Sequence, residues 1–347
     1  SIILLSGIFI SLISNNMFIC WIGLEINMFG VIPFLTSNNS ENSTFFDSNN
    51  EINVSFFYFF VQVIGSLFFG WGAILGGWYA ISIIGLMIKM GIAPFFWWVP
   101  SVIPRLNWLS IGLLSTLQKA PGLFLFRLMF DISLDICILF SLVGFFIASI
   151  GINFSYNNIK NLVSWSSISN MSILFLLIVL NGKLGSIYYL FYSILVLSLC
   201  FSLQSSEVNL ISSSFVGGNN IKNIVSLNSL LLVFTGLPPF ISFLLKVYFL
   251  SGYFLNDSCQ MLIEIDFNGN EVGFFYLLGS YLNGWNIVLV YIILIVIQSI
   301  GYVKAFININ TSSSSSPLNS IRLNNKDKLI FTIFLILYFS SIMVIWL

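Results

Sequence analysis

Long apolar runs separated by short polar breaks dominate the chain from one end to the other. A helix that crosses a lipid bilayer needs about 20 consecutive, mostly apolar residues. The pattern therefore predicts about eleven transmembrane helices, over residues 2–14, 17–36, 54–76, 78–99, 107–129, 134–152, 156–180, 184–204, 223–254, 275–306 and 328–347. The first run is short, and Gly236-Leu237-Pro238-Pro239 interrupts the ninth in its middle.

The polar breaks have the composition of loops rather than of domains. Residues 37–53 are rich in Asn and Ser, 205–222 contain Gly217-Gly218-Asn219-Asn220, and 311–316 form a Thr-Ser tract. None of these segments is long enough to fold as a soluble domain. We therefore expect an all-α polytopic membrane protein with one transmembrane domain spanning 1–347.

The composition agrees with a membrane protein and excludes several functions. Of the 347 residues, 58% are hydrophobic and 7% are charged, with a net charge of zero and a mean hydropathy of +1.00. Soluble domains carry about a quarter charged residues. Nothing in this balance favours binding to nucleic acid. The chain has no His and its four cysteines are scattered, which argues against a metal or redox site and leaves an acid–base enzyme little to work with.

The distribution of basic residues predicts the orientation, because cytoplasmic or matrix loops carry the excess of Lys and Arg. The loops on the N-terminal side hold Arg105, Lys160, Lys222, Lys304, Arg322, Lys326 and Lys328, whereas the opposite loops hold Arg127 and Lys183. We expect the N-terminus on the matrix or cytoplasmic side and, with an odd number of helices, the C-terminus opposite. Ser1 opens into apolar residues without the basic region of a secretory signal.

Four ionisable residues lie inside the apolar runs, namely Glu25, Lys89, Lys119 and Lys246. A charge at the bilayer centre costs about 2.5–3.5 kcal/mol. These side chains must therefore face one another or water. Three lysines and one carboxylate cannot all form pairs among themselves. Such a set is typical of a proton relay, and the alternative is a purely structural group of ion pairs and snorkelling side chains.

Prolines near two of these lysines indicate broken helices. Pro94 follows Lys89 by five residues, and Pro238 and Pro239 precede Lys246. A proline within a membrane helix frees backbone carbonyls, which is tolerable only inside protein or next to water. Two broken helices beside ionisable residues are the sequence pattern of transporters built from inverted repeats.

The seventh run carries a polar face that includes Lys160 at its start, then Ser164, Ser166, Ser167 and Ser169, and Asn170 near its centre. Small polar residues of this kind pack helices closely together. The alternative is a hydrated path that leads protons to the membrane interior, with Lys160, Ser167 and Asn170 as its candidate residues.

Five segments occur in the order found in one family. They are Trp21-Ile22-Gly23-Leu24-Glu25-Ile26-Asn27, Lys89-Met90-Gly91-Ile92-Ala93-Pro94-Phe95, Leu117-Gln118-Lys119, the stretch from Asn158 to Ile168, and Gly236-Leu237-Pro238-Pro239-Phe240 with Lys246. Over about residues 15 to 250 the chain resembles the chain 2 subunits of mitochondrial NADH–ubiquinone oxidoreductase, which are antiporter-like subunits of respiratory complex I. The length resembles that of the short animal-type members.

The resemblance implies inverted five-helix repeats, here 1–129 (truncated at the N-terminus) and 134–306, followed by a C-terminal helix at 328–347. Glu25 resembles the carboxylate paired with the first broken-helix lysine, Lys89, while Lys119 resembles the central lysine and Lys246 the lysine of the second broken helix. The implied role is proton translocation in the inner mitochondrial membrane, driven by quinone reduction elsewhere. The implied partners are other membrane-arm subunits, including neighbouring antiporter-like chains, and lipids. FMN, iron–sulfur clusters and ubiquinone belong to the complex, and none to this chain.

The chain departs from the family pattern at three positions. Phe96 and Asn170 stand where the family usually has His, and Ile159 replaces the Arg before Lys160. A relay here would therefore use Lys, Glu, Ser, Tyr and water. Two further hypotheses remain open at this point: a free-standing cation/proton antiporter of the same superfamily, and a structural spacer.

Overall fold

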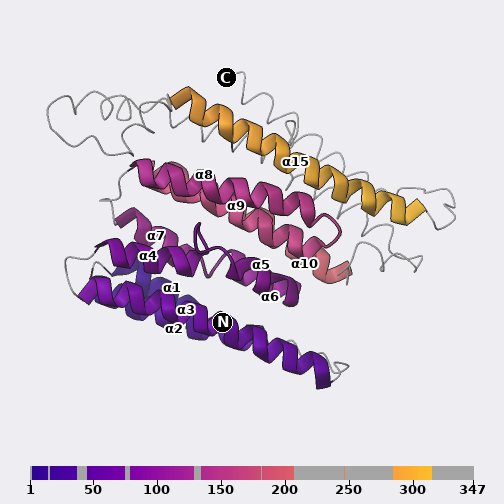
Figure 1. Ribbon diagram of the computed structural model, residues 1–347. Helices are drawn as coiled ribbons and strands as arrows, with labels where there is room; N and C mark the ends of the chain where they lie inside the picture. Colours follow the sequence, from indigo (N-terminus) through magenta and orange to yellow (C-terminus); the bar gives the residue numbers. More distant parts are fainter. Residues whose placement is uncertain are drawn as a thin grey trace, which may run out of the picture. The chain divides into compact units, whose positions relative to one another are not determined.

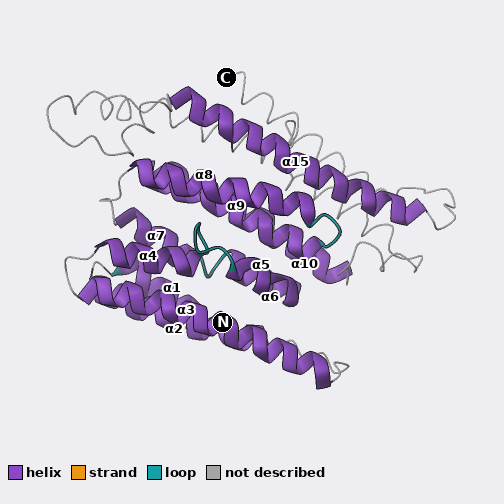
Figure 2. Ribbon diagram, viewed as in Figure 1, coloured by secondary structure: helices purple, strands orange, loops and turns teal. Residues whose placement is uncertain are grey.

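The computed structural model describes residues 2–14, 16–36, 45–74, 79–128, 134–180, 182–206, 246 and 284–314. Within these ranges all regular structure is helical (Figures 1 and 2). The helices are α1 (Ile2–Ile13), α2 (Met17–Thr36), α3 (Phe45–Ile74), α4 (Tyr79–Met90), α5 (Trp98–Val102), the 3-10 turn η1 (Ile103–Arg105), α6 (Trp108–Ser115), α7 (Ala120–Leu128), α8 (Leu134–Phe154), α9 (Ile159–Leu180), α10 (Gly182–Ser206) and α15 (Gly284–Ser314).

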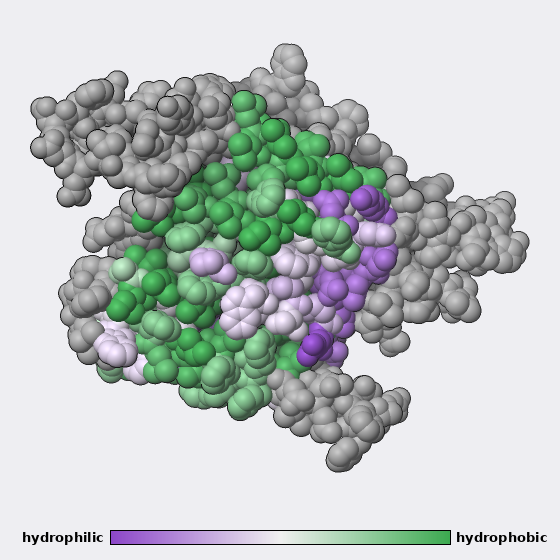
Figure 3. Space-filling view, viewed as in Figure 1, coloured by the Kyte–Doolittle hydropathy of each residue, from purple (hydrophilic) through white to green (hydrophobic). Residues whose placement is uncertain are grey.

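Six helical segments in the described part are long and apolar enough to cross a membrane. They are Met17–Thr36, Val54–Ala73, Trp108–Phe126, Ile136–Phe154, Ile159–Leu180 and Gly182–Gln204. Large apolar side chains remain exposed on several of them, such as Phe60 at 55% and Phe146 at 51%. Figure 3 shows that hydrophobic residues cover much of the visible surface of the described part. The class of polytopic helical membrane protein is thereby confirmed. The predicted run 328–347 and most of 223–254 lie outside the described residues.

The chain divides into two compact units, one of residues 1–148 and 160–204 and the other of residues 149–159 and 205–347. In the first unit α1 packs along α2 and α3 packs along α4. In the second unit Asn153, near the end of α8, donates a hydrogen bond from Nδ2 to the Ile297 carbonyl of α15, at 2.8 Å.

Glycines allow the helix pairs of the first unit to approach closely. A Cβ atom at Gly30 of α2 would lie 2.6 Å from the Leu4 amide nitrogen of α1. At Gly85 of α4 it would lie 2.6 Å from the Gly65 carbonyl oxygen of α3. Membrane helices associate through such backbone-to-backbone packing, because lipid provides no hydrophobic drive between them.

Helix boundaries differ from the expectation at three places. The helix α15 continues to Ser314, into the tract 311–316 that the sequence predicts as loop. The helix α3 begins at Phe45, within the segment 37–53 that the sequence predicts as loop. Apolar residues mark where a helix enters lipid, whereas helical hydrogen bonding can continue into water, so hydropathy misplaces the helix start. In addition, the run 107–129, predicted as one helix, is interrupted between α6 and α7. Pro121 has no amide hydrogen to donate to the carbonyl four residues earlier, which destabilises the helix at this point.

Candidate functional site

The first helix break follows Lys89 directly. The helix α4 ends at Met90, and Gly91 adopts a left-handed conformation with φ of 68°, which glycine accepts without steric cost. Beyond it, the amide of Ile92 donates to the Met87 carbonyl at 3.1 Å, one residue further back than in an α-helix. Pro94 cannot donate at all, so regular hydrogen bonding does not resume until α5. The break predicted from Pro94 is present.

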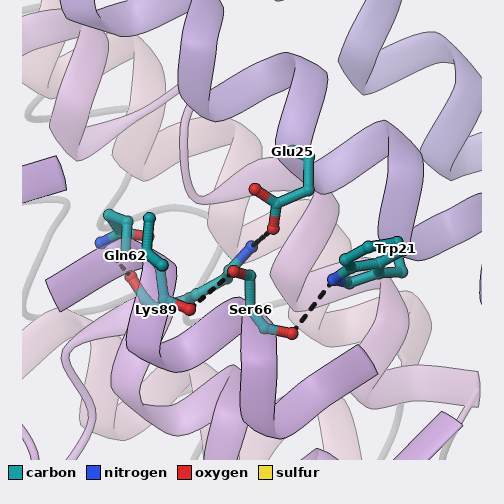
Figure 4. A network of polar contacts seen from close by, with 6 residues as sticks. Trp21, Glu25, Gln62, Ser66 and Lys89 are labelled. Atoms are coloured by element: carbon teal, nitrogen blue, oxygen red, sulfur yellow. Dashed lines mark hydrogen bonds and ion pairs between the residues drawn. The ribbon is translucent and has the colours of Figure 1, made fainter. Parts of the chain in front are cut away.

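Lys89 forms an ion pair with Glu25 at this break. The Lys89 Nζ atom lies 3.4 Å from Glu25 Oε1, and the two side chains are 6% and 20% exposed. Glu25 comes from the middle of α2 and Lys89 from the last turn of α4, so that two segments far apart in the sequence supply the pair (Figure 4). This pairing is the one that the sequence predicts for the first lysine.

Two side chains donate hydrogen bonds to backbone carbonyls at the end of α4. Gln62 of α3 donates from Nε2 to the Lys89 carbonyl at 3.2 Å, and Trp98 of α5 donates from Nε1 to the Ile88 carbonyl at 3.0 Å. The last carbonyls of a helix lack intrahelical partners and must find others when they are buried. Gln62 and Trp98 therefore stabilise the break on the side that carries Lys89.

Lys119 lies in another helix break, the turn between α6 and α7, which is not the break predicted at Pro238 and Pro239. Its amide donates to the Thr116 carbonyl at 2.9 Å, and the same carbonyl accepts the Tyr189 hydroxyl of α10 at 2.7 Å. The Lys119 side chain is buried, and among the described residues its Nζ atom has no hydrogen-bond partner. An ammonium group in such a place requires water or a counter-charge.

The two breaks lie next to each other in the first unit. Gly122, in the first turn of α7, packs against Met90 at the end of α4 so closely that its missing Cβ would overlap the Met90 sulfur. Tyr58 of α3 lies beside Gln118, the neighbour of Lys119, and its ring is 5.9 Å from that of Trp98. Residues of α3 therefore adjoin both breaks.

Several polar atoms in this region are buried without a protein partner. Within the described ranges these include the Tyr58 hydroxyl, Gln62 Oε1, Gln118 Oε1 and Lys119 Nζ. Buried polar atoms in native proteins are nearly always hydrogen-bonded, and internal water supplies the partners that side chains do not. The set is therefore suited to hold water near Lys89 and Lys119.

Sequence reasoning missed the residues that surround the lysines. Tyr58, Gln62 and Tyr189 belong to apolar runs and reach the site through contacts with distant segments. A buried amide such as Gln62 within the run 54–76 is a usable signal, because an uncharged polar group in lipid also needs a partner.

The polar face of α9 is buried and bonded mostly within its own helix. The Ser167 hydroxyl donates to the Ser164 carbonyl at 2.8 Å, and Asn170 Nδ2 donates to the Ser166 carbonyl at 2.9 Å. Asn170 Oδ1 accepts the Tyr188 hydroxyl at 2.9 Å. Close helix packing accounts for these contacts. Because the serine hydroxyls already donate to backbone carbonyls, a water molecule along this face would meet mainly the lone pairs of the hydroxyl oxygens.

The remaining predicted residues have other contacts or lie outside the described residues. Lys160, at the start of α9, lies over the Trp108 ring at 5.6 Å, which is a cation–π contact. The Phe96 ring lies 6.2 Å from the Trp165 ring and is tilted against it by 48°. Lys246 is buried and belongs to the second unit, and Pro238 and Pro239 lie outside the described residues.

No three His, Cys, Asp or Glu side chains gather closely enough to hold a metal ion in the described part of the chain. Cys20, Cys137 and Cys200 are buried free thiols. The ionisable side chains at the two helix breaks of the first unit are the Glu25–Lys89 pair and Lys119.

Curated relatives cover most of the chain. NADH-ubiquinone oxidoreductase chain 2 of Myxine glutinosa is 27% identical over 314 residues, which is 81% of this chain and 85% of the relative. The chain 2 of Crocidura suaveolens gueldenstaedtii is 30% identical over 270 residues, or 73% of this chain and 75% of the relative.

Solved structures share the fold at lower identity. A chain of the archaeal membrane-bound sulfane sulfur reductase matches 98% of this chain and 71% of its own length, with a TM-score of 0.70 and 16% identity. A chain of respiratory complex I from Thermus thermophilus matches 96% and 75%, with a TM-score of 0.69 and 14% identity. The family model described as NADH:quinone oxidoreductase/Mrp antiporter, TM, matches residues 70–267, and the chain belongs to this family of antiporter-like membrane proteins.

Proposed function

We propose that this chain is a proton-translocating core membrane subunit of NADH:ubiquinone oxidoreductase, respiratory complex I, in the inner mitochondrial membrane. The observation that carries the proposal is the largely buried Glu25–Lys89 ion pair at a helix break, in a chain whose family and curated relatives are described as NADH:quinone oxidoreductase or NADH-ubiquinone oxidoreductase subunits. A buried pair of this kind, adjoining a second buried lysine, suits transfer of protons rather than of electrons.

In this proposal the distance between Glu25 and Lys89 controls how strongly Lys89 retains its proton. Two unit charges 4 Å apart attract by about 4 kcal/mol at an effective dielectric constant near 20, and by about half as much at twice that distance. Separation of Glu25 from Lys89 by a few ångströms thus weakens the attraction that holds the proton on Lys89. Water between Gln62, Tyr58 and Gln118 would then conduct a released proton toward Lys119.

The other candidate residues complete the route in this proposal. Lys246 serves as the ionisable group of the second repeat, and Pro238 and Pro239 break its helix as Pro94 breaks the first. Lys160, Ser167 and Asn170 form a candidate hydrated path along α9. The repeats occupy about 1–129 and 134–306, with the helix 328–347 after them, to give eleven spans with the N-terminus on the matrix side and the C-terminus on the intermembrane side.

The chain has a non-redox role in the proposed assembly. FMN, iron–sulfur clusters and ubiquinone are assigned to other subunits, and quinone reduction there shifts the charges that open and close the Glu25–Lys89 pair. The expected partners are neighbouring membrane-arm subunits, antiporter-like chains among them, together with membrane lipids.

A free-standing cation/proton antiporter is the second candidate, because a chain of the Mrp complex from Dietzia sp. shares the fold with a TM-score of 0.70 and 14% identity, over 88% of this chain and 59% of its own length. Native mass spectrometry of detergent-extracted membranes, with NADH oxidation assayed on the same fraction, separates the two. The proposal predicts the chain in a very large assembly that oxidises NADH. Migration alone or as a small oligomer would contradict it and favour the antiporter.

The role of the second-repeat lysine has its own test. Lys246→Met should lower the number of protons moved per NADH oxidised while the assembly still forms. Pumping at the original ratio in this variant would remove Lys246 from the route.

A further inference from the structure

The helix α3 contacts Lys89 directly and contacts α2, the helix of Glu25, through Trp21, although it contributes no charge to the ion pair. We propose that Gln62, on the face of α3 that also carries Gly65, Ser66 and Gly70, is a positioning residue that sets the separation of Glu25 and Lys89. The inference rests on the proposed function in so far as that separation governs proton release.

The contacts on the Lys89 side fix both its main chain and its side chain. Gln62, which is 1% exposed, donates to the Lys89 carbonyl at 3.2 Å. One turn further along α3, a Cβ atom at Gly65 would lie 2.8 Å from Lys89 Cγ and 3.0 Å from the Gly85 carbonyl oxygen. The aliphatic part of the Lys89 side chain therefore passes directly over Gly65, while Gln62 forms a hydrogen bond with the Lys89 main chain.

The contacts on the Glu25 side use the same face of α3. Trp21 lies one helical turn before Glu25 on α2 and donates from Nε1 to the Ser66 carbonyl at 3.0 Å (Figure 4). A Cβ atom at Gly70 would lie 2.9 Å from this Nε1 atom. Positions 62, 66 and 70 follow one another at intervals of four residues, and position 65 lies three residues after 62, so all four lie on one side of the helix. The separation of the two charges thus depends on where α2 and α4 meet this face.

Gln62 replaces a hydrogen bond that is lost at the helix break. Within an unbroken helix the Lys89 carbonyl would accept the amide of residue 93, but α4 ends at Met90 and the chain turns at Gly91. The side-chain amide of Gln62 takes the place of that donor. Without it, the last turn of α4 can unwind or rotate, which carries the Lys89 ammonium away from Glu25.

The test uses cryo-electron microscopy and proton pumping of the purified assembly that contains the chain. Gln62→Met keeps the length and burial of the side chain and removes the donor. We expect the Lys89 Nζ–Glu25 Oε distance to rise from 3.4 Å to beyond the ion-pair limit of about 4 Å, and the protons moved per NADH to fall. Gln298→Met is the matched control: it removes another buried amide, in α15 of the second unit, whose Nε2 contacts Tyr302 of the same helix, and it should leave the pair at its original distance.

A double variant separates positioning from general destabilisation. If Gln62 acts through the pair, Gln62→Met should cause no further loss of pumping in a Glu25→Gln background, because that background has already lost the countercharge. An equal further loss there, or a Glu25–Lys89 distance unchanged in Gln62→Met, would overturn the inference. Where Gln62→Met fails to assemble, Trp21→Phe removes the other hydrogen bond to the same face, and the same distance is measured.

The two proposals fail in different ways. If Glu25→Gln and Lys89→Met pump at the original ratio, the proposed function of the pair is wrong. The distance measured in Gln62→Met still decides in that case whether Gln62 positions the pair.

Discussion

The ammonium of Lys89 and the carboxylate of Glu25 lie 3.4 Å apart, held between the end of α4 and the middle of α2. Lys89 is almost fully buried, whereas Glu25 keeps a fifth of its side chain exposed. The lysine therefore depends on its partner for compensation of its charge more than the carboxylate does. This asymmetry makes the consequence of each single substitution predictable.

Removal of one charge should harm the assembly more than removal of both. Loss of one partner of a buried ion pair costs about 3–5 kcal/mol, whereas replacement of both partners by neutral residues is often near neutral. We expect Glu25→Ala to reduce the amount of assembled complex on native gels, and Glu25→Gln with Lys89→Met together to restore it. A double variant that assembles worse than Glu25→Ala would contradict this account of the pair.

The close approach of α3 and α4 should tolerate no side chain at Gly85. A Cβ atom there would lie 2.5 Å from the Phe69 amide nitrogen and 2.6 Å from the Gly65 carbonyl oxygen, which are backbone atoms that cannot move aside alone. Gly85→Ala should cost about 1–3 kcal/mol through overpacking, seen as a lower midpoint of thermal unfolding. In Gly112→Ala the new Cβ meets Leu197 and Cys200 side chains at an ordinary 3.4 Å, so its midpoint should stay unchanged. Equal midpoints in both variants would show that the α3–α4 approach does not matter.

The turn that carries Lys119 should depend on Tyr189. This hydroxyl donates to the Thr116 carbonyl at 2.7 Å, and its loss should cost about 1 kcal/mol, as for a typical buried hydrogen bond. We expect Tyr189→Phe to lower thermal stability by that amount. Ser193→Ala, on the same helix, removes an exposed hydroxyl that donates to the Leu190 carbonyl one turn earlier and should stay within about 0.5 kcal/mol of the original protein. A Tyr189→Phe protein as stable as the Ser193→Ala control would rule out this support.

Much of this architecture follows from the sequence, because lipid requires long apolar helices and makes each internal charge conspicuous. Six spans in the described part, the helix break between Lys89 and Pro94 and the position of Glu25 and Lys89 inside membrane helices could all be predicted on that basis. The interruption before Lys119 could not, since apolar residues continue across it and Pro121 alone does not distinguish a break from a helical first turn.

Residues that act through distant contacts were also beyond prediction. Gln62 reaches Lys89 across 27 positions of sequence, and Trp21 bonds to Ser66 across 45. Hydropathy marks both side chains as members of membrane helices and contains no information on which neighbouring helix they face. Such contacts depend on how glycines let particular helix pairs meet, which a single sequence does not reveal.

The central claim is that protons pass through the buried lysines of this chain. Its most direct test is the number of protons moved per NADH oxidised, measured in sealed vesicles that contain the assembly with Lys89→Met. Lys183→Met, which removes an exposed lysine at the start of α10, is the control. The account predicts a lower ratio in Lys89→Met and the original ratio in Lys183→Met; because protons are counted per NADH oxidised, the ratio does not depend on how much of each assembly forms. The original ratio in Lys89→Met would contradict it.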